Sequence, residues 1–212
     1  LSSASLNGGL TQSKTIISHH VPKDFHTLTP ERYLRRLLRK KGLDPNAVGL
    51  MTAADMRNIS IVRGNQSGIP FCVAMTAGTS NAMAAGDDPP HFRDRIGTIN
   101  TIVLLDANPT DACLVEMVKV VTEAKAVALR QLDILSHASR QLATGTSTDT
   151  VTVAATGRGK PLMFAGTATP LGSSISKSVT CAVKDAITRQ DGIKAGRPPA
   201  KKLIERGIKL DR

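Results

Sequence analysis

Two stretches of this sequence repeat apolar residues at steps of three and four, and they constrain the fold more than any other feature. The first runs from Cys113 to about Ser136, and the second begins at about Ser174. Their apolar stripes consist of Leu114, Met117, Val118, Val121, Ala128, Leu132 and Leu135, and of Ile175, Val179, Val183 and Ile187. This spacing predicts two long amphipathic helices. Each of them needs another layer of structure to cover its apolar face.

Segments rich in β-branched and apolar residues predict the strands of that other layer. They are NISIVR from Asn58, PFCVAMTA from Pro70, TINTIVLLD from Thr98, DTVTVAA from Asp149 and PLMFAG from Pro161. Strands and helices do not alternate strictly, so we expect an α/β or α+β fold, a single layered domain with a mixed β-sheet and packed helices. Because aromatic residues make up 2% of the chain, aliphatic side chains and Met must build the core. We assign residues 1–191 to this domain and residues 192–212 to a basic, flexible C-terminal tail.

The formal net charge of +11 is concentrated in two stretches. Residues 31–41 carry six basic residues against one acidic residue, and residues 194–212 carry seven against two, so the rest of the chain is nearly neutral. Around the first stretch, Thr29 and Pro30 predict a helix start and Gly42 predicts a stop. A solvated helix face explains this basic run better than a binding patch. A module that binds a polyanion or nucleic acid is therefore only an alternative function, and few rings are present to stack on bases.

Cysteines and histidines argue against a disulfide framework and against a bound metal ion. Cys72, Cys113 and Cys181 are odd in number, far apart and set among apolar residues, which favours a reducing, cytoplasmic location. The five histidines form no metal-binding spacing, so we predict a metal-independent protein without a cofactor. No apolar run is long enough to span a bilayer, and residues 1–10 lack the features of a signal peptide. Because there is no initiator Met, we expect the native sequence to begin before Leu1.

Small and hydroxylated residues gather in four short segments. These are residues 2–9, 76–82, 97–100 and 143–149, and three of the four adjoin a predicted strand. Such loops offer backbone amides, hydroxyls and side-chain amides to the carbonyl, amide or phosphate groups of a ligand. Turns select the same residue types, so this pattern taken alone favours a structural role.

The same segments resemble the adenosylcobinamide amidohydrolase family, over roughly residues 1–191. The resemblance rests on the order and spacing of LSSASLNGG, VGLMTAA from Val48, TAGTSNAMAAGD from Thr76, GTIN from Gly97, TEAK from Thr122, ATGTSTD from Ala143 and AGTATPLG from Ala165. Thr79 and Ser147 depart from the family pattern, in which we expect a hydrophobic residue and Gly. The resemblance implies corrinoid salvage for cobalamin (vitamin B12) biosynthesis. In that reaction water cleaves the amide between the corrin ring and the aminopropanol arm of adenosylcobinamide, giving adenosylcobyric acid and aminopropanol.

Hydrolysis of an amide requires an activated oxygen, donors for the oxyanion and an acid for the leaving amine. The oxygen is either a side-chain hydroxyl or a water molecule held by a carboxylate. Candidate catalytic residues are Asp149, Glu123, Ser80 and Thr146, with Asp149 and Glu123 as the preferred acids. Candidate substrate-binding residues are Asn7, Thr76, Asn81, Asp87, Thr98, Asn100, Lys125, Thr144 and Thr148. Because the loops 76–82 and 143–149 both lie at predicted strand ends, we expect them to meet in one pocket.

Glu123 and Lys125 lie on the same predicted helix but are two residues apart, so helix geometry keeps them from forming one dyad. Glu123 could equally well make a surface pair with Lys119. Lys125 lies near the apolar face, where a lysine is either paired or extends its ammonium group to water. We expect a small-molecule corrinoid as the partner, with cobalt entering only as part of it, and no nucleic acid and no membrane. A homo-oligomer is compatible with the sequence. A related amidase with another substrate is the remaining alternative.

Overall fold

The computed structural model describes residues 1–88 and 97–193, so the predicted tail lies outside the described residues after Ile193. Its helices are α1 (Pro30–Lys41), the short 3-10 helix η1 (Met56–Asn58), α2 (Asp111–Gln131) and α3 (Pro170–Asp191). Its strands are β1 (Ile16–His20), β2 (Val48–Thr52), β3 (Ser60–Gln66), β4 (Ile69–Ala77), β5 (Ala82–Met83), β6 (Ile99–Leu105), β7 (Asn108–Pro109), β8 (Gly145–Thr146), β9 (Thr150–Ala155) and β10 (Pro161–Leu162). This arrangement confirms the predicted fold class of a mixed sheet with packed helices.

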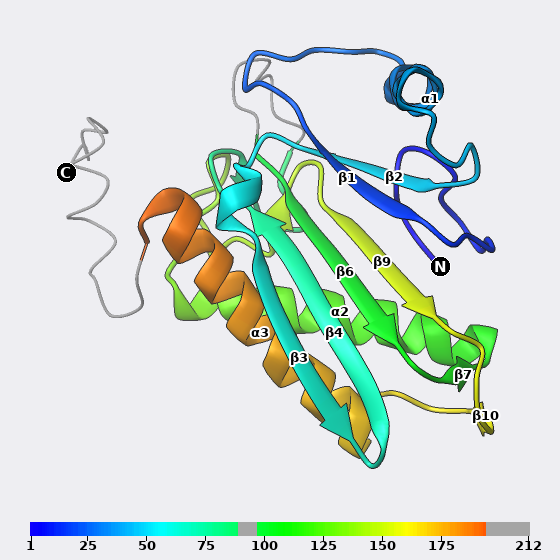
Figure 1. The fold of residues 1–212 in the computed structure, drawn as a ribbon. Coiled ribbons are helices and arrows are strands. Elements are labelled where there is room, and N and C mark those ends of the chain that lie inside the picture. Colours follow the sequence, from blue (N-terminus) through cyan, green and yellow to red (C-terminus); the bar gives the residue numbers. More distant parts are fainter. Residues whose placement is uncertain (89–96, 194–212) are drawn as a thin grey trace.

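A four-stranded sheet in the order β3-β4-β6-β9 forms the centre of the molecule (Figure 1). β3, β4 and β6 are antiparallel neighbours, whereas β9 runs parallel to β6. α2 and α3 pack side by side on one face of this sheet. Alternate strand residues, among them Met75, Val103 and Val153, are buried in the core under these helices. Aliphatic side chains and Met fill this core, and Phe71 is its one aromatic ring among the described residues.

The N-terminal residues form a smaller layer on the other face of the sheet (Figure 1). β1 and β2 pair in parallel, and α1 packs on them through the buried side chains of Leu34 and Leu38. β2 reaches β6, where the side-chain amide of Asn100 donates a hydrogen bond to the carbonyl oxygen of Met51 at 2.7 Å. Two small apolar clusters hold this layer together, separate from the core under α2 and α3.

The helix and strand boundaries differ from the predicted ones for local reasons. α3 begins at Pro170, earlier than predicted, because the hydroxyl of Thr169 caps it by accepting a hydrogen bond from the N–H of Gly172 at 3.0 Å. α2 ends at Gln131 instead of near Ser136, and Asp133 just beyond it adopts a left-handed φ of 52°. The segment predicted as a strand from Pro161 contributes only the two residues of β10.

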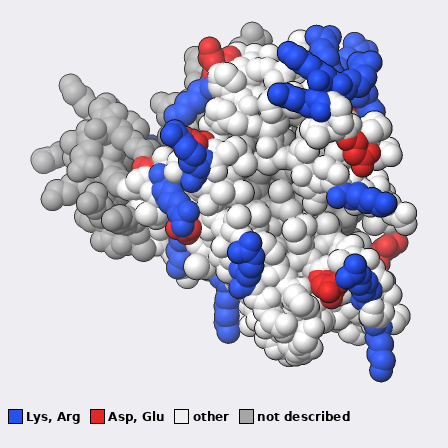
Figure 2. Space-filling model, in the orientation of Figure 1, with Lys and Arg blue, Asp and Glu red and all other residues white. Residues whose placement is uncertain are grey.

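Lysine and arginine side chains gather over α1 at one edge of the molecule (Figure 2). Arg32, Arg36 and Arg39 are exposed, whereas the apolar side of the helix is buried. Arg35 pairs with Glu31 at 2.6 Å, one turn away. The basic run is therefore the solvated face of an amphipathic helix, as its spacing predicted. None of the described helices is long and apolar enough to cross a membrane.

Candidate active site

The carboxylate of Asp149 is the centre of a buried polar cluster at the end of the sheet where β6 and β9 begin. Its Oδ2 accepts hydrogen bonds from Lys125 Nζ and, at 3.0 Å, from the backbone N–H of Thr146. Its Oδ1 accepts from the Thr146 hydroxyl and, at 3.0 Å, from the backbone N–H of Ile99. The side chains of Lys125 and Asp149 are 8% and 11% exposed, so this ion pair is nearly removed from water. A carboxylate offers about four lone-pair positions, and these donors occupy them.

Three elements deliver the groups around Asp149. Lys125 comes from α2 and is paired, one of the two states expected for a lysine on that helix face. Thr146 ends β8 and Ile99 begins β6. Gly145 lies against both charges, because a Cβ atom there would be 2.5 Å from Asp149 Oδ2 and 2.9 Å from Lys125 Nζ. The close approach of the backbone at this position therefore requires glycine.

The loops 76–82 and 143–149 lie next to each other beside this cluster, and a common pocket between them stays a prediction. β5 pairs with β8 in antiparallel register. Next to that pairing, Asn81 Nδ2 donates a hydrogen bond to Ser147 Oγ at 2.7 Å. Asn81 is buried, whereas its neighbour Ser80 and the facing Ser147 are exposed. The junction of the two loops thus lies just below the protein surface.

A contact with α3 that no sequence pattern indicated fixes the first of these loops. Asp191 Oδ2 accepts hydrogen bonds from the backbone N–H of Thr79 at 2.9 Å and from its hydroxyl at 2.7 Å. Thr79 is one of the two departures from the family pattern noted in the sequence. Its hydroxyl gives this chain a polar anchor at a position where we expected a hydrophobic residue.

A second group of hydroxyl and amide side chains lies at the same end of the sheet, beside β2. Asn100 Oδ1 accepts hydrogen bonds from the hydroxyls of Thr98 at 3.2 Å and Thr150 at 2.8 Å. The Thr148 hydroxyl donates to the carbonyl oxygen of Gly97 at 2.9 Å, and the Thr76 hydroxyl contacts that of Thr52 at 3.4 Å. These contacts hold the loops to the sheet, and a role in substrate binding stays a prediction.

Asp87 and Thr144 fix the turn that follows β5. Asp87 Oδ2 accepts hydrogen bonds from the hydroxyl of Ser136 and, at 2.7 Å, from the backbone N–H of Ala84. The hydrogen bond from Ser136 is the main reason that the pKa of Asp87 lies below its ordinary value. The Thr144 hydroxyl accepts a hydrogen bond from the N–H of Ala85 at 2.9 Å, which ties the turn to the loop 143–149.

Two candidate residues lie apart from the Asp149 cluster. Glu123 is exposed on α2, although Lys125 two residues later is buried. The side-chain amide of Asn7 donates to the carbonyl oxygens of Pro45 at 3.0 Å and Ala47 at 2.9 Å, and so anchors the N-terminal segment beside β2. The geometry therefore favours Asp149 over Glu123 as the carboxylate of the site.

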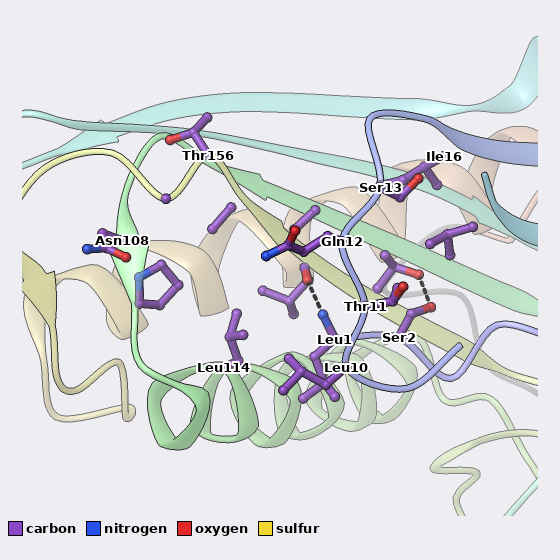
Figure 3. Close-up of a pocket in the computed structure, with 17 residues that line it drawn as sticks. Leu1, Ser2, Leu10, Thr11, Gln12, Ser13, Ile16, Asn108, Leu114 and Thr156 are labelled. Atoms are coloured by element: carbon purple, nitrogen blue, oxygen red, sulfur yellow. Dashed lines mark hydrogen bonds between the residues drawn. The ribbon is translucent and has the colours of Figure 1, made fainter. Parts of the chain in front are cut away.

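Two cavities lie elsewhere on the molecule. One of about 460 Å³ is at the far end of β9, where Leu1, Leu10, Asn108, Leu114 and Thr156 line it (Figure 3). A second, of about 830 Å³, is bordered by Ala74, Ile102 and Leu104 on the sheet face away from α2 and α3. Among the described residues, no group of His, Cys, Asp and Glu side chains is placed to hold a metal ion. All three cysteines are free thiols.

Comparison with known proteins establishes the family. The family model for adenosylcobinamide amidohydrolase matches residues 1–195. The chain belongs to this family. Adenosylcobinamide amidohydrolases of Methanosarcina mazei and Halobacterium salinarum are 29% and 31% identical to it over 191 and 193 residues, which cover 86% and 87% of this chain and 86% and 78% of theirs. An uncharacterized protein of Methanocaldococcus jannaschii is 29% identical over 208 residues, covering 88% of this chain and 81% of that protein.

Several of the segments that carried the resemblance to the adenosylcobinamide amidohydrolase family lie at the two ends of the sheet, whereas residues 1–9 run alongside β9 and β2. Those at 76–87, 97–100 and 143–149 surround the Asp149 cluster, together with Lys125 of the TEAK segment. AGTATPLG lies at the opposite end, where residues 165–172 form the entry to α3. The polar end of the sheet is therefore the candidate active site.

Proposed function

We propose that this protein is an adenosylcobinamide amidohydrolase that acts in corrinoid salvage. The family match over residues 1–195 carries the proposal. The meeting of two family segments at the buried pair of Asp149 and Lys125 supports it. In the reaction the amide C–N bond between the corrin side chain and the aminopropanol arm breaks. The carbonyl carbon gains the oxygen of water, and the nitrogen leaves as a protonated amine.

Thr146 is the best-placed attacking oxygen of the cluster. Its hydroxyl hydrogen is directed at Asp149, which leaves the oxygen lone pairs available for attack on a carbonyl carbon. Asp149 accepts the proton as the C–O bond forms and passes it to the nitrogen as the C–N bond breaks. Water then hydrolyses the ester on Thr146 and restores the hydroxyl. Lys125 holds Asp149 in place and balances its charge.

Direct activation of water by Asp149 is the less favoured route. The lone-pair positions of its carboxylate are already taken by donors from Lys125, Thr146 and Ile99. A water molecule would have to displace one of them before it could donate its proton. The Thr146 hydroxyl needs no such rearrangement.

Mass spectrometry of the corrinoid after incubation with the purified protein tests the proposed function. We expect conversion of adenosylcobinamide to adenosylcobyric acid with release of aminopropanol, and we expect it to persist after exhaustive chelation of metal ions. Recovery of the corrinoid unchanged would contradict the proposed substrate. Activity that disappears on chelation and returns with zinc would instead contradict metal independence alone.

A further inference from the structure

The side-chain amide of Asn81 has one engaged end and one unsatisfied end. Its Nδ2 donates to Ser147 Oγ at 2.7 Å. Its Oδ1 is buried and has no hydrogen-bond partner among the described residues, and the residue as a whole is only 7% exposed. A buried amide oxygen without a donor is destabilising, so this atom requires a hydrogen-bond donor from outside the described residues.

Two further oxygens lie close to Asn81 Oδ1, around Gly97. A Cβ atom built on Gly97 would be 2.4 Å from Asn81 Oδ1, 2.7 Å from the carbonyl oxygen of Gly78 and 2.9 Å from Ser80 Oγ. Three oxygens of the loop 76–82 therefore lie around the backbone of Gly97, and they can approach it this closely because Gly97 has no side chain. We call these three atoms the oxygen cradle. Ser80 is exposed, so the cradle lies next to solvent.

The chemistry of the cradle selects a hydrogen-bond donor as its ligand. A carbonyl oxygen and an amide oxygen only accept hydrogen bonds, and a hydroxyl can accept as well as donate. Asn81 Nδ2 already donates one hydrogen bond to Ser147, and Asn81 Oδ1 presents a hydrogen-bond acceptor. The N–H of an amide or an alkylammonium group fits this arrangement.

We propose that the oxygen cradle binds the nitrogen side of the scissile amide and, after cleavage, the ammonium group of the aminopropanol product. This inference rests on the proposed function for the identity of the amine. Asn81 Oδ1 receives the amide N–H in the substrate, which turns the carbonyl carbon toward the attacking oxygen. After cleavage the same oxygen receives a hydrogen of the ammonium group, so Asn81 is a substrate-positioning residue.

Binding of 1-amino-2-propanol to two Asn81 variants, measured by calorimetry without any corrinoid, tests the proposal. Asn81→Asp keeps an acceptor at this position and adds a negative charge, so the amine should bind as tightly as in the wild type or more tightly, with a stronger dependence on salt. Asn81→Leu keeps the approximate size but removes the acceptor, and should weaken amine binding roughly three- to tenfold. Equal losses in both variants, or no loss in Asn81→Leu, would overturn the proposal.

Two additional measurements keep the test decisive. Asn108→Leu, at the other end of the sheet, is the matched control and should bind the amine like the wild type. If Asn81→Leu does not fold, Asn81→Asp decides alone, because weaker amine binding in that variant contradicts an acceptor role. A wild-type protein that binds the amine but leaves adenosylcobinamide intact would refute the proposed function and retain the cradle as an amine site.

Discussion

Four hydrogen bonds converge on the carboxylate of Asp149, and they determine what this residue can do. Burial of a single charge is strongly unfavourable, and the ammonium group of Lys125 with the N–H groups of Ile99 and Thr146 offsets that penalty. The remaining donor, the Thr146 hydroxyl, can give up its proton to Asp149 and then attack a substrate. The carboxylate is therefore better suited to orient Thr146 than to bind water.

Substitution of Asp149 and Thr146 tests this division of roles. Asp149→Asn keeps the size of the side chain but removes the charge and the proton acceptor, so kcat for aminopropanol release should fall by about 10²- to 10⁴-fold. Thr146→Val, which removes the hydroxyl, should cause a comparable loss, whereas Thr146→Ser should retain most of the rate. Steady-state kinetics with adenosylcobinamide measures all three variants.

Glu123→Gln is the matched control for Asp149→Asn. Because Glu123 is exposed on α2, the rate should stay unchanged and the free energy of unfolding should change by less than about 1 kcal/mol. If Glu123→Gln loses as much rate as Asp149→Asn, Glu123 takes part in the reaction. Full activity of Thr146→Val would favour attack by water over attack by the hydroxyl.

At the scale of elements, the start of α3 shows why one family segment lies far from the polar cluster. A Cβ atom on Gly172 would be 2.1 Å from the carbonyl oxygen of Gly166 and 2.3 Å from that of Ala165. Thr169 caps the helix in the same segment. AGTATPLG thus encodes a tight entry into α3, the helix whose other end holds Thr79 through Asp191.

Gly172→Ala should therefore destabilise the protein through α3. The added methyl group meets backbone atoms that cannot rotate away, so we expect a loss of about 1–3 kcal/mol in the free energy of unfolding. Denaturant titration followed by circular dichroism measures it. Gly166→Ala in the same segment is the control, since its Cβ would approach Glu116 no closer than 3.6 Å and should have little effect. If both variants lose a similar free energy of unfolding, the collision with the backbone at Gly172 is not the cause of the destabilisation.

The elements differ in how well their sequences predicted them. α2 and α3 have long apolar stripes at helical spacing, and β4, β6 and β9 combine β-branched with other apolar residues. β1 and β2 did not stand out, because IISHH and VGLMT are short and lack regular alternation, and their pairing depends on packing against α1. The place of Lys125 on the helix face left two states open, paired or extended to water, and the ion pair with Asp149 became visible only in the structure. Asp191 likewise became visible only through a tertiary contact with Thr79.

At the scale of the whole molecule, the chain has one main core and a smaller N-terminal layer. The main core fills the space between the central sheet and the helices α2 and α3. The N-terminal layer depends on two clusters of a few side chains, among them Leu6, Leu34 and Leu38 in one and Val48 and Leu50 in the other. Regions with few buried apolar contacts open at lower free energy than the core. This layer should consequently open before the central sheet does.

Hydrogen exchange of the Leu38→Ala variant tests this separation. Leu38 is 1% exposed, and its truncation should destabilise its surroundings by about 2–5 kcal/mol. Because the affected cluster belongs to the N-terminal layer, amide exchange should become faster in α1, β1 and β2 while the slowest amides of β4 and β6 keep their rates. Leu129→Ala, in the main core, is the control and should accelerate exchange in both regions, since the layer cannot persist without the sheet beneath it. Equal acceleration of β2 and β6 in Leu38→Ala would instead mean that the molecule opens as one cooperative unit.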